Sequence, residues 1–316
     1  MFQDIYPHKF DNQFRNIHPE KGDKVLCYRD GKALLKGIST PADAEAAGVG
    51  GTPAEVGAAD HGVDGAWIPV LGELREDGVD VDEEALNYGF SVDGEKFFVS
   101  RVAFGDCNGV CGEVDGALPK GYQLVETRAA RDTMDHLLAF QLIMGLHLFD
   151  WYSKTKFCGK CGTPMELGTK ERAMICPKCG NVVYPRISPV IIVGVTHGDE
   201  ILLTKYADRD YSRYALIAGF MEFGETPEDT VRREVYEEAG LRVKEITYYK
   251  SQPWPYPDSL LLGFYAEVDE AAPEGLTPVL RDGELGEATW FKRSDVPKAE
   301  SDFALTSELM ENFRNS

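Results

Sequence analysis

The chain has 316 residues and a formal charge of −20 at pH 7, and 43% of its residues are hydrophobic. This length allows two or three domains with a sizeable core, and the charge argues against a broad electrostatic grip on nucleic acid. The start of the chain has no apolar run behind a basic end, as a secretory signal would have. The longest apolar segment, residues 137–149, is too short to span a bilayer. We therefore expect a cytoplasmic protein with no membrane partner.

The first 126 residues predict an N-terminal domain of α+β character, because short apolar runs alternate with turn residues between 67 and 102. Residues 39–66 are rich in glycine, alanine and acidic residues, and predict a flexible insertion in this domain. Residues 127–152 predict a linking helix, whose apolar residues at helical spacing form core or a subunit interface.

Residues 153–187 contain two Cys-x2-Cys knuckles, 14 residues apart, each with a glycine after its second cysteine. Four thiolates at this spacing predict one closed, tetrahedral and structural Zn²⁺ site per chain. The alternative, two disulfides, fits poorly with a chain that lacks a secretory signal. The four predicted ligands are Cys158, Cys161, Cys176 and Cys179, whereas Cys27, Cys107 and Cys111 are interpreted as free thiols.

Residues 151–186 are also locally basic, with seven Lys or Arg against two Glu. This basic segment could meet phosphate groups even though the whole chain is acidic.

Residues 188–316 predict a mixed β-sheet sandwiched between α-helices, because strands are expected on both sides of one helix and a second helix closes the chain. The expected strands cover 189–195, 201–206, 246–249, 260–268 and 288–291, and the closing helix covers 302–313.

Residues 219–241 predict the end of a strand, a tight loop and a helix with defined ends. Thr226 is suited to cap the helix, Pro227 suits its first position, and Gly240 provides a left-handed exit. An ion pair between Arg233 and Glu225 is expected to hold the loop.

Three carboxylates share one edge of this predicted helix, beside its buried face. Glu234, Glu237 and Glu238 occupy positions i, i+3 and i+4, where like charges repel one another. A bound divalent cation explains such a cluster better than solvation does.

The same window resembles the conserved box of the Nudix hydrolase family. Gly219 is followed after five residues by Glu225, and after seven more by the run REVYEEAGL at 233–241, with no fixed position missing. The resemblance implies a Nudix fold at 188–316, and an enzyme that hydrolyses a nucleoside diphosphate linked to another moiety.

Residues 251–259 have the sequence SQPWPYPDS, with three prolines at alternate positions. The prolines favour an extended segment and exclude α-helix, so Gln252, Trp254, Tyr256 and Asp258 are expected to project in a fixed pattern. Such a rigid wall with two aromatic rings suits a flat heterocycle on a polar tether.

This run resembles the SQPWPFPxS array of the NAD(H) pyrophosphatase branch of the Nudix family, with Tyr256 in place of the usual Phe. The cysteine ribbon, the following Tyr-Pro-Arg and the box stand in the order found in that branch. The resemblance implies a NAD(+)/NADH diphosphatase that splits NAD(H) into nicotinamide mononucleotide and AMP, with related enzymes removing NAD caps from RNA 5′ ends. It also implies a homodimer.

The resemblance assigns catalytic Mg²⁺ or Mn²⁺ to Glu234 and Glu238, with help from the backbone carbonyl of Ala218 and from a late glutamate. Glu284 and Glu287 match the two late glutamates of the family, and we rank Glu284 first as the metal ligand. Glu237 is a candidate general base, and Glu284 is its competitor.

For the substrate, the resemblance implies stacking on Phe220, and contact with Tyr184 and Glu171 of the ribbon. Arg172 stands where the family often has an aromatic residue, and Arg128 is a weaker substrate candidate. The array is expected to line the remaining ligand surface through Gln252, Pro253, Trp254, Pro255, Tyr256, Pro257, Asp258 and Ser259.

Three alternatives to free NAD(H) stay open at this point. The same site could act chiefly on NAD-capped RNA, or could belong to a Nudix hydrolase of ADP-ribose or dinucleoside polyphosphates. The chain could also be a non-enzymatic binding module, although the intact set of box carboxylates counts against this interpretation.

Overall fold

The computed structural model describes two compact units. One unit comprises Ile187–Ser316 together with Met1–Gln3, and the other comprises Asp4–Arg186. The described residues are 1–37, 65–105, 118–207, 213–256, 258–281, 283–298 and 303–316. Most of the predicted insertion, Cys107, Cys111 and Pro257 therefore lie outside the described residues, and the finer domain boundaries stay predictions.

The unit that contains the C-terminus is built on one mixed sheet. Its strands run in the order β14, β15, β11, β12, β16, and β13 pairs with β11. The β11 and β15 strands are parallel, whereas the other described pairs are antiparallel. The bounds are β11 (Ser188–His197), β12 (Glu200–Tyr206), β13 (Ile217–Phe220), β14 (Val243–Trp254), β15 (Ser259–Val268) and β16 (Leu285–Lys292).

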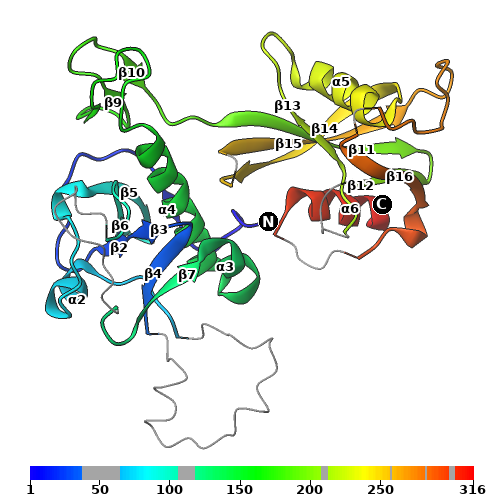
Figure 1. Cartoon of the computed structure of the whole chain (residues 1–316). Coiled ribbons are helices and arrows are strands. Elements are labelled where there is room, and N and C mark those ends of the chain that lie inside the picture. The colour runs from blue at the N-terminus through cyan, green and yellow to red at the C-terminus, as the bar shows by residue number, and fades with distance from the viewer. Residues whose placement is uncertain (38–64, 106–117, 208–212, 257, 282, 299–302) are drawn as a thin grey trace, which may run out of the picture. The chain divides into compact units, whose positions relative to one another are not determined.

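Helices α5 (Pro227–Ala239) and α6 (Leu305–Asn315) lie on opposite faces of this sheet, as Figure 1 shows. On β11, Ile191 joins the apolar cluster of α5, whereas Ile192 joins the cluster of α6. Neighbouring residues of a strand point to opposite faces, so the sheet contributes one apolar face to each helix. The predicted sandwich is confirmed.

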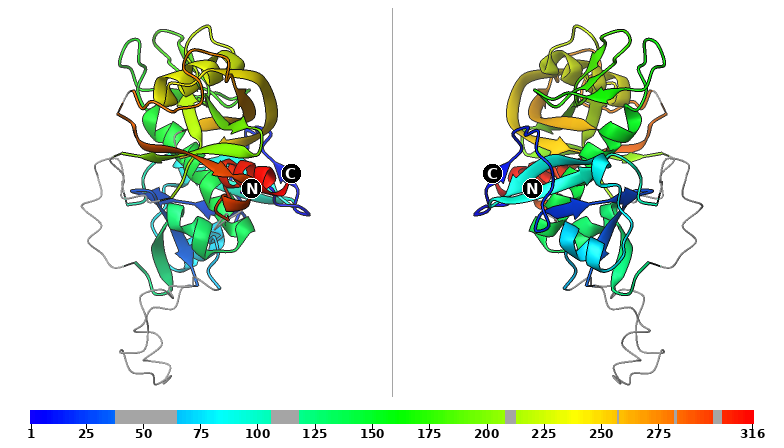
Figure 2. Two further views of the ribbon diagram at one scale, coloured as in Figure 1. Left: turned by 90° about the vertical axis from the view of Figure 1, so that its right-hand side faces the viewer. Right: turned by 90° about the vertical axis from the view of Figure 1, so that its left-hand side faces the viewer.

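The first three residues of the chain belong to this same unit. Met1 lies in the cluster between the sheet and α6, and Figure 2 shows the chain's first residues beside α6. The short helix η2 (Arg293–Asp295) connects β16 towards α6.

The described residues of the other unit form three small sheets, in agreement with the predicted α+β character. In strand order, the first sheet is β1 (Phe10–Asp11), β5 (Leu86–Val92), β6 (Glu95–Ser100) and β2 (Lys24–Leu26); the second is β3 (Tyr28–Arg29), β4 (Lys32–Lys36) and β7 (Tyr122–Glu126); the third is β10 (Val182–Val183), β9 (Met174–Ile175) and β8 (Glu166–Leu167). Two short helices, α2 (Leu71–Glu76) and η1 (Glu83–Ala85), complete this unit together with two helices between 127 and 154.

The prediction of one continuous helix over 127–152 is wrong, because the segment forms two helices, α3 (Thr127–Thr133) and α4 (His136–Lys154). The carboxylate of Asp135 accepts hydrogen bonds from the backbone N–H groups of Leu137 (2.9 Å) and Leu138 (3.2 Å). This cap satisfies donors that a helix start leaves unpaired, so a new helix begins after Asp135.

The apolar side of α4 is core of its own unit. Leu142 and Ile143 are fully buried, and the Tyr28 hydroxyl donates to the Leu142 carbonyl at 2.7 Å. Gly145 lies so close to this ring that a Cβ there would stand 2.3 Å from the Tyr28 hydroxyl oxygen. None of the helices in the described residues combines the length and apolar character needed to cross a membrane.

Replacing Asp135 by alanine should lower the free energy of unfolding by about 1 kcal/mol, because the first turn of α4 loses its cap. Urea unfolding followed by circular dichroism measures this loss, and hydrogen exchange should accelerate at Leu137 and Leu138. Asp135→Asn keeps an acceptor oxygen and should retain most of the stability; equal losses in both variants would contradict the cap.

Candidate active site and zinc site

Helix α5 carries the predicted carboxylates, and its ends form as expected. The Thr226 hydroxyl accepts a hydrogen bond from the Asp229 N–H at 3.1 Å, and Pro227 opens the helix. Gly240 ends it with a left-handed φ of 67°, a conformation that glycine adopts without strain. These local signals fix the phase of the helix, and hence the direction of its glutamates.

The three glutamates differ in exposure. The side chain of Glu234 is 12% exposed and that of Glu237 is 53% exposed, while Glu238 as a residue is 4% exposed. Two of the three acidic groups are therefore largely removed from water, which is costly for a carboxylate without a cationic partner.

Gly219 makes room for one of these carboxylates. A Cβ on Gly219 would lie 1.9 Å from the Glu234 carboxyl carbon, so any side chain there would displace this group. Gly219, the first glycine of the box, lies on β13. Its position requires glycine, because the Glu234 carboxylate lies where a side chain would be.

One guanidinium connects the loop with the carboxylates of the helix. Arg233 donates to both oxygens of Glu225, at 2.6 and 3.0 Å, which confirms the predicted pair. It also donates to Glu234 at 2.7 Å, to Glu237 at 3.0 Å and to the Phe220 carbonyl at 2.9 Å. Bidentate pairing of this kind fixes geometry as well as charge.

The pKa values of Glu225 and Glu234 are shifted in opposite directions. The hydrogen bonds from Arg233 are the main cause that lowers the pKa of Glu225 to about 2, with further help from the Glu222 N–H. Burial raises the pKa of Glu234, and the nearby charges of Glu237 and Glu284 add to this increase while Arg233 opposes it. Glu225 is therefore a fixed anion of the loop, whereas burial and the neighbouring carboxylates keep the pKa of Glu234 raised despite its ion pair with Arg233.

The two late glutamates have different surroundings. Glu284 precedes β16 and is close enough to raise the pKa of Glu234. Glu287 accepts hydrogen bonds from Lys205 at 3.0 Å and from Tyr214 at 3.1 Å. Glu284 is thus close enough to the carboxylates of α5 to affect the charge of Glu234. Glu287 is bound instead by Lys205 and Tyr214.

These surroundings suit a divalent cation, because the little-exposed carboxylate of Glu234 lies against Gly219 and the charge of the exposed Glu284 acts on it. Among the described residues, only the four ribbon cysteines form a group of three or more ligands within 4.8 Å of one another. The acidic residues are less tightly gathered than those thiols. Ala218, the predicted carbonyl ligand, lies on β13 one residue before Gly219.

The predicted stacking residue Phe220 ends β13 and is 53% exposed, so its ring is accessible. Phe223, in the following loop, is fully exposed. The Phe220 backbone is held in place by its hydrogen bond from Arg233.

The proline array forms the end of β14 and the turn into β15. The strand reaches Trp254, and Trp254 pairs with Ser259 across the turn. The predicted extended segment is therefore confirmed for residues 251–254 only, because Tyr256 and Asp258 lie in a turn, where Asp258 has a φ of 53°. Pro253 lies on an edge strand of the sheet, where a missing N–H is tolerated. The Trp254 and Tyr256 rings make an edge contact at 5.5 Å between centroids.

The residues of the array differ in what they can offer a ligand. Pro253 is exposed and Trp254, Tyr256 and Asp258 are half-buried, whereas Pro255 and Ser259 are buried. Gln252 is fully buried and turned into the protein, where its amide binds backbone and side-chain groups. This orientation differs from the expected projection of Gln252 towards a ligand, because the start of α6 requires its amide.

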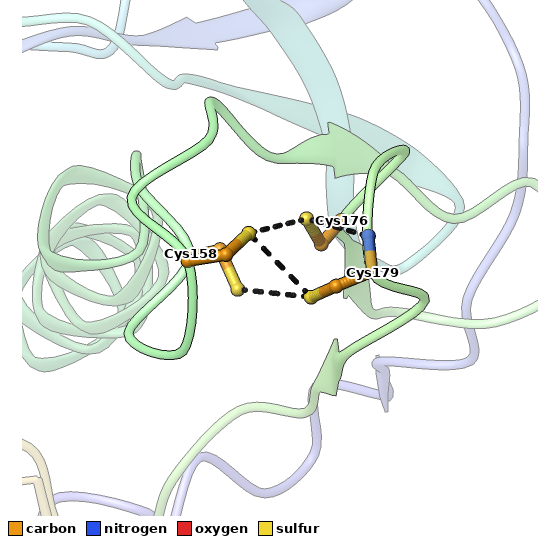
Figure 3. A group of neighbouring side chains, drawn as sticks. Cys158, Cys176 and Cys179 are labelled. Carbon is orange, nitrogen blue, oxygen red and sulfur yellow. Dashed lines mark hydrogen bonds between the residues drawn. The ribbon is translucent and has the colours of Figure 1, made fainter.

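The four cysteines of the ribbon meet as the spacing predicts. The Sγ atom of Cys161 lies 3.5 Å from that of Cys176 and 3.6 Å from that of Cys179, and the Cys158 and Cys179 sulfurs are 3.6 Å apart. Figure 3 shows the labelled sulfurs turned towards one another. None of these four residues is in a disulfide.

The sulfur geometry fits a tetrahedral zinc ion. Zn–S bonds of about 2.3 Å place sulfurs about 3.8 Å apart, close to the observed separations. Hydrogen bonds with the side chain and backbone of Thr163 lower the pKa of Cys161 to about 6, which favours the thiolate that binds metal. Gly162 and Gly180 follow the knuckles with φ of 70° and 71°, so both turns use the left-handed conformation.

The ribbon also brings together its two predicted substrate residues. The Tyr184 hydroxyl donates to the Glu171 carboxylate at 2.9 Å, and Tyr184 is 53% exposed. Next to Glu171, Arg172 donates to the Gly89 carbonyl of β5 at 2.6 Å, and burial lowers its pKa. Arg172 thus fastens the ribbon to its neighbouring sheet, whereas Arg128 is an exposed residue of α3.

Sequence reasoning missed several supporting residues. Thr230 is fully buried and donates to Glu225 at 2.8 Å, and Lys205 and Tyr214 hold Glu287. Phe2 and Phe303 stack behind the proline array, with centroids 5.4 Å apart. No local pattern indicates most of these contacts, since the partners are far apart in the sequence.

Two family models match this chain. The model described as NUDIX domain covers residues 185–313, and the model described as NADH pyrophosphatase zinc ribbon domain covers residues 153–184.

Relatives match over part of the chain. A Deinococcus radiodurans protein named NAD-capped RNA hydrolase NudC is 39% identical over 201 residues, which are 62% of this chain and 70% of that protein. A Salmonella typhi protein of the same name is 43% identical over 159 residues, which are 50% of this chain and 60% of that protein. A solved NUDIX hydrolase from Nitrosomonas europaea is 26% identical, with a TM-score of 0.44, and is matched over 51% of this chain and 90% of that one.

Chelation of zinc should unfold the ribbon, because the ion joins two knuckles that are otherwise held by one small apolar cluster. We expect one zinc per chain by elemental analysis, and loss of hydrogen-exchange protection over residues 158–183 after chelator treatment. Cys161→Ser should lose zinc, while Cys27→Ser, which changes a buried cysteine far from the knuckles in sequence, should retain it. Zinc content that is unchanged in Cys161→Ser would contradict the site.

Proposed function

The chain belongs to the Nudix hydrolase family, in the branch with the NADH pyrophosphatase zinc ribbon, and we propose that it hydrolyses the pyrophosphate bond of NAD(H). The products are nicotinamide mononucleotide and AMP. The observation that carries this proposal is the pair of little-exposed carboxylates, Glu234 and Glu238, on the helix of a 219–241 segment that contains the complete family box.

The proposed cation ligands are Glu234 and Glu238 of α5, the carbonyl of Ala218 and the carboxylate of Glu284. Mg²⁺ or Mn²⁺ bound there would neutralise the pyrophosphate oxygens and orient a water molecule. The low exposure of Glu234 and the charge that it experiences from Glu284 support this ligand set.

The protein's own residues would accept the proton of the attacking water. Glu237 is the first candidate for this general base, with a side chain exposed enough to reach solvent, and Glu284 is the competitor. Arg233 is proposed to orient the acidic side chains rather than to bind phosphate, because its guanidinium already contacts three carboxylates and a carbonyl.

The proposed surface for the bases of the dinucleotide combines Phe220 with the accessible members of the array, Pro253, Trp254, Tyr256 and Asp258. Aromatic faces of this kind stack on flat heterocycles. Tyr184 and Glu171 are proposed as further substrate contacts, as the family resemblance implies, and their mutual hydrogen bond supports a common role.

NAD-capped RNA is a second candidate substrate for the same site, and is favoured by the names of the curated relatives. The matched part spans 70% of the Deinococcus relative and 60% of the Salmonella relative, so this activity is a proposal for the present chain. Hydrolysis of ADP-ribose or dinucleoside polyphosphates is disfavoured by the array. A homodimer is proposed from the family resemblance, and light scattering of the purified protein measures it.

Product analysis tests the proposal. Purified protein with Mg²⁺ or Mn²⁺ should convert NADH to nicotinamide mononucleotide and AMP, and should release 5′-monophosphate RNA from an NAD-capped transcript. Glu238→Gln should lower kcat/KM at least about 100-fold, because a metal ligand is lost.

Glu228→Gln is the matched control for this experiment. Glu228 lies in the first turn of the same helix and is exposed, so its loss should leave the rate unchanged. If the protein cleaves no dinucleotide while zinc remains bound, the result supports the non-enzymatic binding module. If the protein cleaves ADP-ribose faster than NADH, ADP-ribose replaces NAD(H) as the proposed substrate.

The two late glutamates should differ in their importance. Glu284→Gln should reduce kcat at least about 100-fold, as a ligand or base is lost, whereas Glu287→Gln should reduce it by about tenfold or less. Steady-state kinetics with NADH, together with Mn²⁺ binding by calorimetry, measure both effects. The reverse order would assign the metal to Glu287.

A further inference from the structure

The first residues of the chain pack behind the proline array, within the same compact unit. Met1–Gln3 is grouped with Ile187–Ser316, whereas Asp4 begins the other unit. Phe2 is fully buried, and its backbone N–H donates to the Phe303 carbonyl at 3.2 Å. A segment that begins the sequence is therefore an internal part of the C-terminal unit.

Four aromatic rings form a continuous row from this segment to the array. The Phe2 ring stacks on Phe303 with centroids 5.4 Å apart and an interplanar angle of 28°. Phe303 meets the edge of Trp254 at 6.4 Å, and Trp254 meets Tyr256 at 5.5 Å. Because packed rings leave little free volume, the position of Phe2 limits where Trp254 can lie.

A hydrogen-bonded chain runs beside these rings. The Gln252 amide nitrogen donates to the Phe303 carbonyl at 2.8 Å and to the Gln3 side-chain oxygen at 3.2 Å. Its oxygen accepts from the Leu305 N–H at 2.7 Å.

The last of these bonds caps α6 from outside the helix, because the N-cap position, Ala304, makes no side-chain cap bond. Gln252 is thus saturated by protein groups and joins three separate segments.

We propose that Phe2 and Gln3 are positioning residues for the dinucleotide-binding wall: they brace Phe303 and Gln252, and so hold Trp254 and Tyr256 in the orientation that stacks on the substrate. This proposal rests on the proposed function of the array. Neither residue touches the reacting atoms, so their loss acts on substrate binding and leaves the hydrolytic groups of α5 in place.

Phe2→Ala tests the brace through separate measurement of kcat and KM for NADH. We expect KM to rise about fivefold to tenfold with kcat within about twofold, because the binding wall is loosened and the chemistry is not. Phe2→Leu refills most of the volume and should restore KM. Hydrogen exchange over residues 250–256 should accelerate in Phe2→Ala without any substrate present.

Phe313→Ala is the matched control, because it also removes a buried phenylalanine ring, but near the C-terminal end of α6. It should lower thermal stability as Phe2→Ala does and leave KM unchanged. In a double-mutant cycle, Trp254→Ala should abolish the effect of Phe2→Ala on KM.

The outcomes separate the two proposals. Wild-type protein that does not cleave NADH overturns the proposed function, and the positioning role with it. Wild-type activity with an unchanged KM in Phe2→Ala, an equal rise in KM in Phe313→Ala, or additive effects with Trp254→Ala overturns the positioning role alone.

Discussion

The contacts of Arg233 hold the candidate active site together. One guanidinium binds the loop carboxylate Glu225 through both oxygens, and reaches Glu234, Glu237 and the Phe220 carbonyl with its remaining donors. Without it, closely spaced acidic groups on one helix edge would repel one another, and the loop would lose its main attachment to the helix. Arg233 also binds the carbonyl of Phe220, whose strand is paired with β11.

The proline array is supported by residues in the interior of its own unit. Prolines restrict the backbone of this edge strand, but they do not fix the side chains. Gln252 provides that support from the interior, where it joins β14 to the start of α6 and to Gln3. The Gln252 amide thus supports the strand from the interior, with its donors and acceptor bound to protein groups.

The ribbon combines a four-cysteine metal site with a hydrogen-bonded pair of surface residues, Tyr184 and Glu171. Its cysteines lie in a small apolar cluster with Met165 and Met174, where a zinc ion would join the two knuckles. Around this centre, Tyr184 and Glu171 pair at the surface, while Arg172 reaches in the other direction to β5. The unusual arginine beside Glu171 is explained by this attachment, because its guanidinium donates to a backbone carbonyl of β5 from a half-buried position.

The sequence alone determined the features that depend on local spacing: the cysteine knuckles, the caps of α5, the direction of its glutamates, the Arg233–Glu225 pair and the mixed sheet between helices. These follow from turn chemistry and from the periods of helix and strand, which act over a few residues. The Asp135 cap that starts α4 is also local, but the apolar spacing that continues across it favoured a single helix. Only the tertiary structure decided that Gln252 turns inward and that Phe2 packs behind Trp254. The partners of Gln252 and Phe2 lie far away in the chain, where no local sequence pattern indicates them.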